Sequence, residues 1–159
     1  MLAGLLTVPL GAETAVLEAV ADAAGPGTGR VREFPAGNVI VIQFRTWGVF
    51  RWQVDSADLF LHIASGPVPT SVEVAIITDN WTEADPFTDT GKLAFTVCKS
   101  RAEPQDWISV RVPSAMVEEI AAGRAAGGLA VRVKSAKPLS IHARESSSFT
   151  PNLIVSGSK

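Results

Sequence analysis

The segment LSIHARESSSFTPNLIV, residues 139–155, decides the fold. Apolar residues at positions 139, 141 and 143 alternate with polar ones, and after a polar run an apolar stretch follows at 153–155. Such alternation is typical of β-strands, because successive side chains of a strand point to opposite faces of the sheet. The segment therefore predicts two strands joined by a loop that contains Arg144 and Glu145.

The same two-residue period runs through most of the chain upstream, in short segments separated by glycine and proline turns. These segments are residues 30–34, 39–47, 50–54, 58–65, 71–78, 93–99, 107–112 and 129–134. Short strands at this spacing predict an all-β fold, specifically an antiparallel jelly-roll β-sandwich. His62 and His142 fall at outward strand positions, where we expect exposed side chains without a role.

One segment departs from the strand period. Residues 114–122 carry a helical stripe formed by Met116, Val117 and Ile120, which predicts one short helix. Ser114 is a suitable N-cap, and Gly123 is suited to the position just after the helix.

The N-terminal region divides the chain into two parts. Residues 1–24 are expected to form an arm or a first edge segment, and residues 25–159 the β-sandwich domain. Residues 14–24 fit two structures: their alanine and glutamate content favours a helix, whereas their alternation permits a strand. The glycine-rich stretch 25–29 predicts a loop.

Composition excludes several classes of protein. The chain has 159 residues, of which 47% are hydrophobic and 19% charged, which indicates a globular domain. A net charge of −2 gives no field that would attract nucleic acid. The lone Cys98 rules out an internal disulfide. No apolar run approaches the roughly 20 residues of a membrane span, and the N-terminus lacks the basic region of a signal peptide.

The candidate ligand-binding residues are aromatic, with one arginine. Trp47, Trp52 and Trp107 are wide enough to stack on a sugar ring, and Arg144 is placed to bind its hydroxyls. The alternative is that these tryptophans cover the ends of the sandwich or an oligomer interface. Trp81 is assigned to core or loop packing.

Two further sets of residues have competing interpretations. Asp79, Asp85 and Asp89 offer oxygen ligands to a calcium ion, but aspartate is also an ordinary turn residue. Arg144 and Glu145 bind a ligand or form a structural pair that fixes the last turn, and the structural interpretation is preferred. No set of acid, base and nucleophile can be assembled, so the chain is not expected to be an enzyme and, calcium aside, no cofactor is expected.

Five segments in order resemble the DNRLRE-type domain, a jelly-roll β-sandwich of bacterial and phage surface proteins related to carbohydrate-binding modules. The matching segments are SADLFLH (56–62), DNWTE (79–83), WISVRVPSAMV (107–117), GGLAV (127–131), and ARES (143–146) with PNLIV (151–155). The resemblance covers about residues 54–156. Ala143 stands where the family usually has serine, and residues 112–114 also depart from its pattern.

Together these observations favour a non-enzymatic structural module of an assembled surface, such as a phage virion decoration or tail component. Its expected partners are other copies of the chain or other surface and virion proteins, and its expected location is a virion or a cell surface. The alternative is a carbohydrate-binding module that recognises a polysaccharide through exposed tryptophan.

Overall fold

The computed structural model describes residues 12–24, 33–35, 39–146 and 148–159. Within these ranges the chain is mostly antiparallel β-structure with one short helix, so the predicted fold class is confirmed. The N-terminal segment whose sequence fits both a helix and a strand forms strand β1 (Glu13–Ala23). This strand belongs to two sheets. Its buried residues alternate around Leu17 and Ala19, so packing on one face overrides the helical propensity of its composition.

The first sheet has the strand order β7-β8-β4-β11-β1. Its other members are β4 (Gln53–Ser65), β7 (Ser100–Ala102), β8 (Trp107–Val112) and β11 (Asn152–Ser158). The far end of β4 also pairs with β10 (Ser140–His142), which in turn pairs with β2 (Glu33–Pro35). The segment 139–155 thus forms strand, loop and strand as predicted, with the turn η4 (Arg144–Ser146) between β10 and β11.

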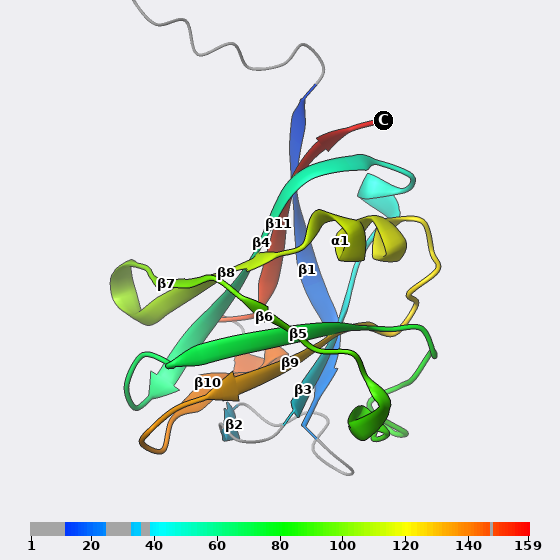
Figure 1. The fold of residues 1–159 in the computed structure, drawn as a ribbon. Helices are drawn as coiled ribbons and strands as arrows, with labels where there is room; N and C mark the ends of the chain where they lie inside the picture. The colour runs from blue at the N-terminus through cyan, green and yellow to red at the C-terminus, as the bar shows by residue number, and fades with distance from the viewer. Residues whose placement is uncertain (1–11, 25–32, 36–38, 147) are drawn as a thin grey trace, which may run out of the picture.

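The second sheet has the order β1-β3-β9-β5-β6. Its other members are β3 (Val39–Phe44), β5 (Ser71–Ile77), β6 (Thr96–Cys98) and β9 (Gly128–Lys134). Strand β1 runs from beside β11 to beside β3 and so joins the two sheets along one edge (Figure 1). At the other edge the chain crosses from β6 to β7 through Lys99, whose carbonyl accepts the backbone N–H of Arg111 at 2.9 Å. The sandwich is therefore nearly closed.

Several predicted strand boundaries differ from the observed ones. The strand predicted over 39–47 ends at Phe44, and Trp47 lies in the turn η1 (Trp47–Val49). Residues 53–54 of the first predicted segment and the segment 58–65 form one continuous strand, β4, because its backbone pairs with β11 from Gln53 to Phe60, with a register shift near Asp55. Between the predicted strands 93–99 and 107–112 the chain forms β7 and the turn η3 (Pro104–Asp106). The predicted loop 25–29 and residues 30–32 of the predicted strand 30–34 lie outside the described residues.

The core lies between the two sheets, and a second apolar cluster lies on the outer face of the second sheet. There the long β5–β6 loop, which includes the turn η2 (Thr90–Lys92), packs Trp81 against a surface that includes Ala23, Ala75 and Ala130. The Trp81 indole N–H donates to the carbonyl of Gly127 at 2.8 Å. The assignment of Trp81 to packing is therefore confirmed.

The predicted helix is α1 (Ser114–Ala121), which packs on β4 and β5 at one end of the sandwich (Figure 1). Gly123 follows it with a φ of 78°, as predicted. The N-cap is Pro113 and not Ser114, because the Ser114 hydroxyl donates instead to the carbonyl of Asp55 at 3.2 Å. Among the described residues no helix has the length and apolar character needed to cross a membrane.

Candidate ligand-binding face

The outer face of the first sheet carries polar side chains from several strands. Strand register places Glu18, Asn152, Phe60 and Ser109 in one row across four strands. The alternate residues of the same strands, among them Leu59, point inward and are buried. Because adjacent strands lie about 4.8 Å apart, the five strands present a face about 19 Å wide.

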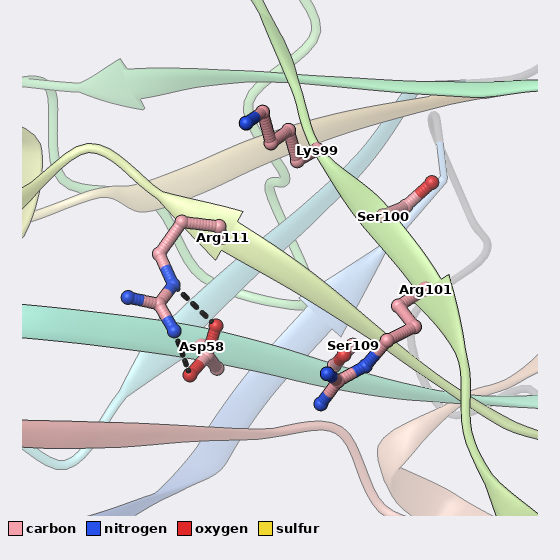
Figure 2. A pocket seen from close by; sticks show the side chains of 6 residues that line it. All are labelled: Asp58, Lys99, Ser100, Arg101, Ser109 and Arg111. Atoms are coloured by element: carbon pink, nitrogen blue, oxygen red, sulfur yellow. Dashed lines mark hydrogen bonds and ion pairs between the residues drawn. The ribbon is translucent and has the colours of Figure 1, made fainter.

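A hollow of about 530 Å³ lies at the β7–β8 side of this face (Figure 2). Its lining residues are Asp58, Lys99, Ser100, Arg101, Ser109 and Arg111. Arg111 on β8 donates two hydrogen bonds, at 2.8 and 3.1 Å, to the carboxylate of Asp58 on β4. Lys99, Ser100 and Arg101 come from the chain segment that crosses between the sheets.

The electrostatics of this hollow favour an anionic or hydroxyl-rich ligand. Three cationic side chains and one carboxylate line it. Just beside it, Glu103 accepts hydrogen bonds from the Ser109 hydroxyl at 2.8 Å and from Arg101 Nε at 3.0 Å. These two bonds, that from Ser109 first, lower the pKa of Glu103 below its ordinary value. Because Lys99 is exposed, its ammonium group is accessible to a ligand.

Two further hollows adjoin each other on the same face and share Trp107 and Asn152. The one of about 340 Å³ is lined by Phe60, Glu103, Pro104, Trp107, Asn152 and Ile154. The one of about 450 Å³ is lined by Glu18, Ala19, Trp107, Arg144, Ser148, Thr150 and Asn152. The structure thus brings Trp107 and Arg144, two of the predicted ligand-binding residues, to one hollow. Trp107 is half-buried at the start of β8, with its ring between the two hollows.

Arg144 also takes part in an ion-pair cluster, which is the structural role proposed for it with Glu145. Its guanidinium donates to the Glu83 carboxylate at 2.6 and 3.2 Å and to the Glu145 carboxylate at 2.7 Å. The hydrogen bond to Glu83, followed by the negative charges of Glu83 and Glu145, raises the pKa of Arg144 above its ordinary value. The cluster links the β5–β6 loop to η4, so Arg144 both fixes the last turn and lines a hollow.

Asp22 on β1 completes this cluster and was not identified from the sequence. It is fully buried, and its Oδ2 accepts the backbone N–H of Arg144 at 2.5 Å. Its Oδ1 has no hydrogen-bond partner within the described ranges. Burial raises the pKa of Asp22 from 3.8 to about 6, and the bond from Arg144 only partly offsets that effect.

The other two predicted tryptophans lie elsewhere. Trp47 is 79% exposed in η1, between β3 and β4, and lines none of these three hollows. Trp52 is buried within the main core, so it is not available to a ligand. The prediction that Trp52 binds a ligand is therefore corrected. Its alternation with exposed Arg51 and Gln53 is the sequence signal that would have placed it inside.

Asp79, Asp85 and Asp89, the predicted calcium ligands, lie in the β5–β6 loop. Asp89 is ion-paired with Lys92 at 3.1 Å, and the backbone N–H of Asp85 donates to the Thr82 hydroxyl at 3.1 Å. Among the described residues no group of three or more His, Cys, Asp or Glu could hold a metal ion. The positions of these aspartates therefore lend the calcium hypothesis no support.

The histidine prediction was wrong in one respect. His62 and His142 do point to the outer side of their strands, but His62 is only 7% exposed and its Nδ1 lies 2.9 Å from Nδ1 of His142. Phe149, from the loop before β11, stacks on both rings and covers His62. Outward parity does not imply exposure where such a loop folds back over the sheet.

No protein-family model matches the chain, and a search of curated proteins finds no significant match.

Proposed function

We propose that this chain is a non-enzymatic module that binds a polysaccharide across the outer face of its first sheet. The observation that carries the proposal is the position of Trp107, which lines two adjoining hollows together with Arg144, Asn152 and Glu103. Sugar rings are held by the flat face of an aromatic side chain with charged and amide groups around it. The resemblance to DNRLRE-type domains, whose relatives include carbohydrate-binding modules, points the same way.

The extent of the face favours a linear chain over a single sugar. The three hollows follow one another across the five strands, from the β1 side to the β7 side. The cationic hollow at the β7 end favours polysaccharides that carry sulfate or carboxylate groups, because Lys99 and Arg101 there would meet their charge. In this proposal the side chains of this face contact the ligand, and none of them takes part in a catalytic step.

The proposal predicts that Trp107→Ala weakens binding to a polysaccharide that the wild-type chain binds. Affinity electrophoresis against cellulose, xylan, dextran sulfate and polygalacturonate measures this, and a loss of at least about tenfold is expected from removal of one stacking contact. The matched control is Trp47→Ala, which removes an exposed tryptophan elsewhere. Arg101→Gln, at an exposed position, should weaken binding to dextran sulfate without affecting the fold.

The outcomes separate the alternatives. Retention of no polysaccharide by the wild-type chain would rule out this function. Loss of binding in Trp47→Ala but not in Trp107→Ala would move the site to the β3–β4 connection.

A structural module of an assembled surface, such as a virion, remains the second candidate, and the free edge of β1 favours it. On the side of β1 that faces β11, the backbone N–H of Ala19 donates to the carbonyl of Pro151. On the opposite side, the carbonyl of Glu18 accepts the backbone N–H of Arg45. By the alternation of an antiparallel ladder, the backbone groups of Thr14 and Val16 point away from β11. In the described ranges no strand pairs with that side of residues 13–17, and Val16 is 59% exposed. Such an edge can pair with a second chain.

Val16→Lys tests this candidate, because a lysine on a strand edge opposes edge-to-edge pairing. If the chain assembles through β1, light scattering will detect a concentration-dependent oligomer that Val16→Lys converts to a monomer. Val68→Lys is the matched control, at a loop valine that is 53% exposed. A wild-type monomer at every concentration would exclude assembly through this edge. A deletion of residues 1–24 is less informative, since it removes β1 and its buried Leu17.

A further inference from the structure

His62 packs against Trp107, and the other histidine of the chain, His142, contacts His62. His62 on β4 and His142 on β10 approach with their Nδ1 atoms 2.9 Å apart. The other ring nitrogen of His62, Nε2, lies 2.9 Å from the carbonyl oxygen of Gln105. A carbonyl oxygen only accepts, so His62 Nε2 carries a hydrogen.

His62 supports Trp107 through ring packing. The edge-to-face contact between the two rings has a centroid distance of 5.1 Å and an interplanar angle of 78°. Phe149 stacks on His62 at 3.9 Å and on His142 at 4.8 Å. A shift of the His62 ring would therefore change the position of the Trp107 ring that packs against it.

His62 also supports the backbone that leads into Trp107. Gln105 and Asp106 have φ angles of 60° and 66°, in the left-handed region that residues with a side chain seldom adopt. The hydrogen bond from His62 Nε2 to the Gln105 carbonyl stabilises this strained turn. His62 is thus a positioning residue for Trp107 on two counts.

The His62–His142 contact holds only one proton. With both rings neutral, His142 Nδ1 donates to His62 Nδ1. When one more proton is taken up, one ring is a cation and still donates to the Nδ1 of the other. With two added protons both Nδ1 atoms carry hydrogens, and the hydrogen bond cannot exist. The last proton therefore binds only if the two rings separate.

Charged groups lie near the pair. Asp106 directly precedes Trp107, in the turn before β8. Glu103 and Arg144 line the hollows beside Trp107. Glu103 is ion-paired with Arg101, and Arg144 is ion-paired with Glu83 and Glu145. Asp22, which contacts the backbone of Arg144, titrates near pH 6.

We propose that His62 positions Trp107 for ligand binding, and that uptake of the second proton by the His62–His142 pair withdraws Trp107, so that binding is lost in acid. This rests on the proposed polysaccharide-binding function. Release of His142 would free Phe149 from its place on both rings, and Phe149 also lies near Trp107, with 6.4 Å between their ring centroids.

The first test needs no ligand. Since the chain has only two histidines, long-range ¹H–¹⁵N NMR resolves both rings and reports which nitrogens carry hydrogens. It is run between about pH 8 and about pH 5, the range in which histidines titrate. The Asp22→Asn variant serves as the background, because it removes another group that titrates near pH 6. We expect the Trp107 indole signal to shift with the second protonation and not with the first. Independent titration of the two histidines, with the Trp107 signal unmoved, overturns the proposal.

The second test measures binding to xylan or dextran sulfate, neither of which titrates in this range. One pH unit below the second midpoint, about a tenth of the molecules remain competent, so affinity should fall about tenfold. His142→Asn should remove most of this fall, because its amide can donate to neutral His62 and accept from protonated His62. His62→Asn should weaken binding throughout the range. A full acid loss in folded His142→Asn contradicts the proposal. If neither polysaccharide binds at any pH, the binding function fails, and the NMR result alone decides the coupling.

Discussion

Gly128→Ala is expected to destabilise the domain by about 4 kcal/mol or more, the range associated with a buried steric conflict. Gly128 opens β9 with a φ of +77°, and a Cβ at this position would lie 2.1 Å from the backbone carbonyl oxygen of Ile42. That oxygen belongs to β3, which pairs with β9 in the middle of the second sheet. Neither strand can move aside without breaking the hydrogen bonds between β3 and β9, so the steric conflict destabilises the folded state. Because a domain is stable by only about 5–15 kcal/mol, a large unfolded fraction is expected.

Gly123→Ala is the matched control for this prediction. Gly123 has nearly the same φ, +78°, but nothing lies within 4 Å of the position of its Cβ. Its substitution should therefore carry only the left-handed penalty of about 1–2 kcal/mol. Urea unfolding followed by circular dichroism compares the two variants. Equal midpoints would mean that the approach of β9 to β3 is looser than described and that backbone conformation alone sets the cost.

Much of the fold follows from local sequence, because a half-buried strand needs little more than alternation. The segments at 107–112 and 139–155 were predicted nearly residue by residue, and α1 was predicted to within one residue. The boundaries that were wrong depend on pairing partners. β4 is one strand because β11 pairs along its first half, and Asp55 lies within the strand although its polarity suggests a break.

The candidate face was only partly predictable for the same reason. Trp107 and Arg144 were identified by residue type and parity, but their meeting depends on the loop between β10 and β11. The His62–His142 contact joins residues 80 positions apart, and the Asp22–Arg144 contact joins residues 122 apart. No spacing rule relates such pairs. Asp22 stands among alanines and valines, so its position in a strand that crosses both sheets determines its burial.

Asp22 makes the stability of the domain depend on pH in an unusual direction. Its pKa is about 6 in the folded chain and has the ordinary value of 3.8 when unfolded. Between these values the folded state binds the proton that the unfolded state has released, so stability falls as pH rises through this window. At about 1.4 kcal/mol per pH unit, the full loss amounts to about 3 kcal/mol. Glu73, Glu103 and Glu119 act oppositely, because their lowered pKa values give stability that is lost only as pH falls below about 4.5.

Asp22→Asn isolates this effect, because the amide can still accept the Arg144 backbone N–H but does not titrate. Urea unfolding of both proteins at matched pH between about 3 and about 7 gives the difference in their free energies of unfolding. This difference should shift in favour of the variant by about 3 kcal/mol as pH rises, since contributions common to both proteins cancel. A difference that stays constant with pH would mean that the buried carboxyl of Asp22 remains ionised, with Arg144 compensating its charge. The unpartnered Oδ1 argues against that outcome, because an ionised oxygen buried without a donor is far less stable than a protonated one.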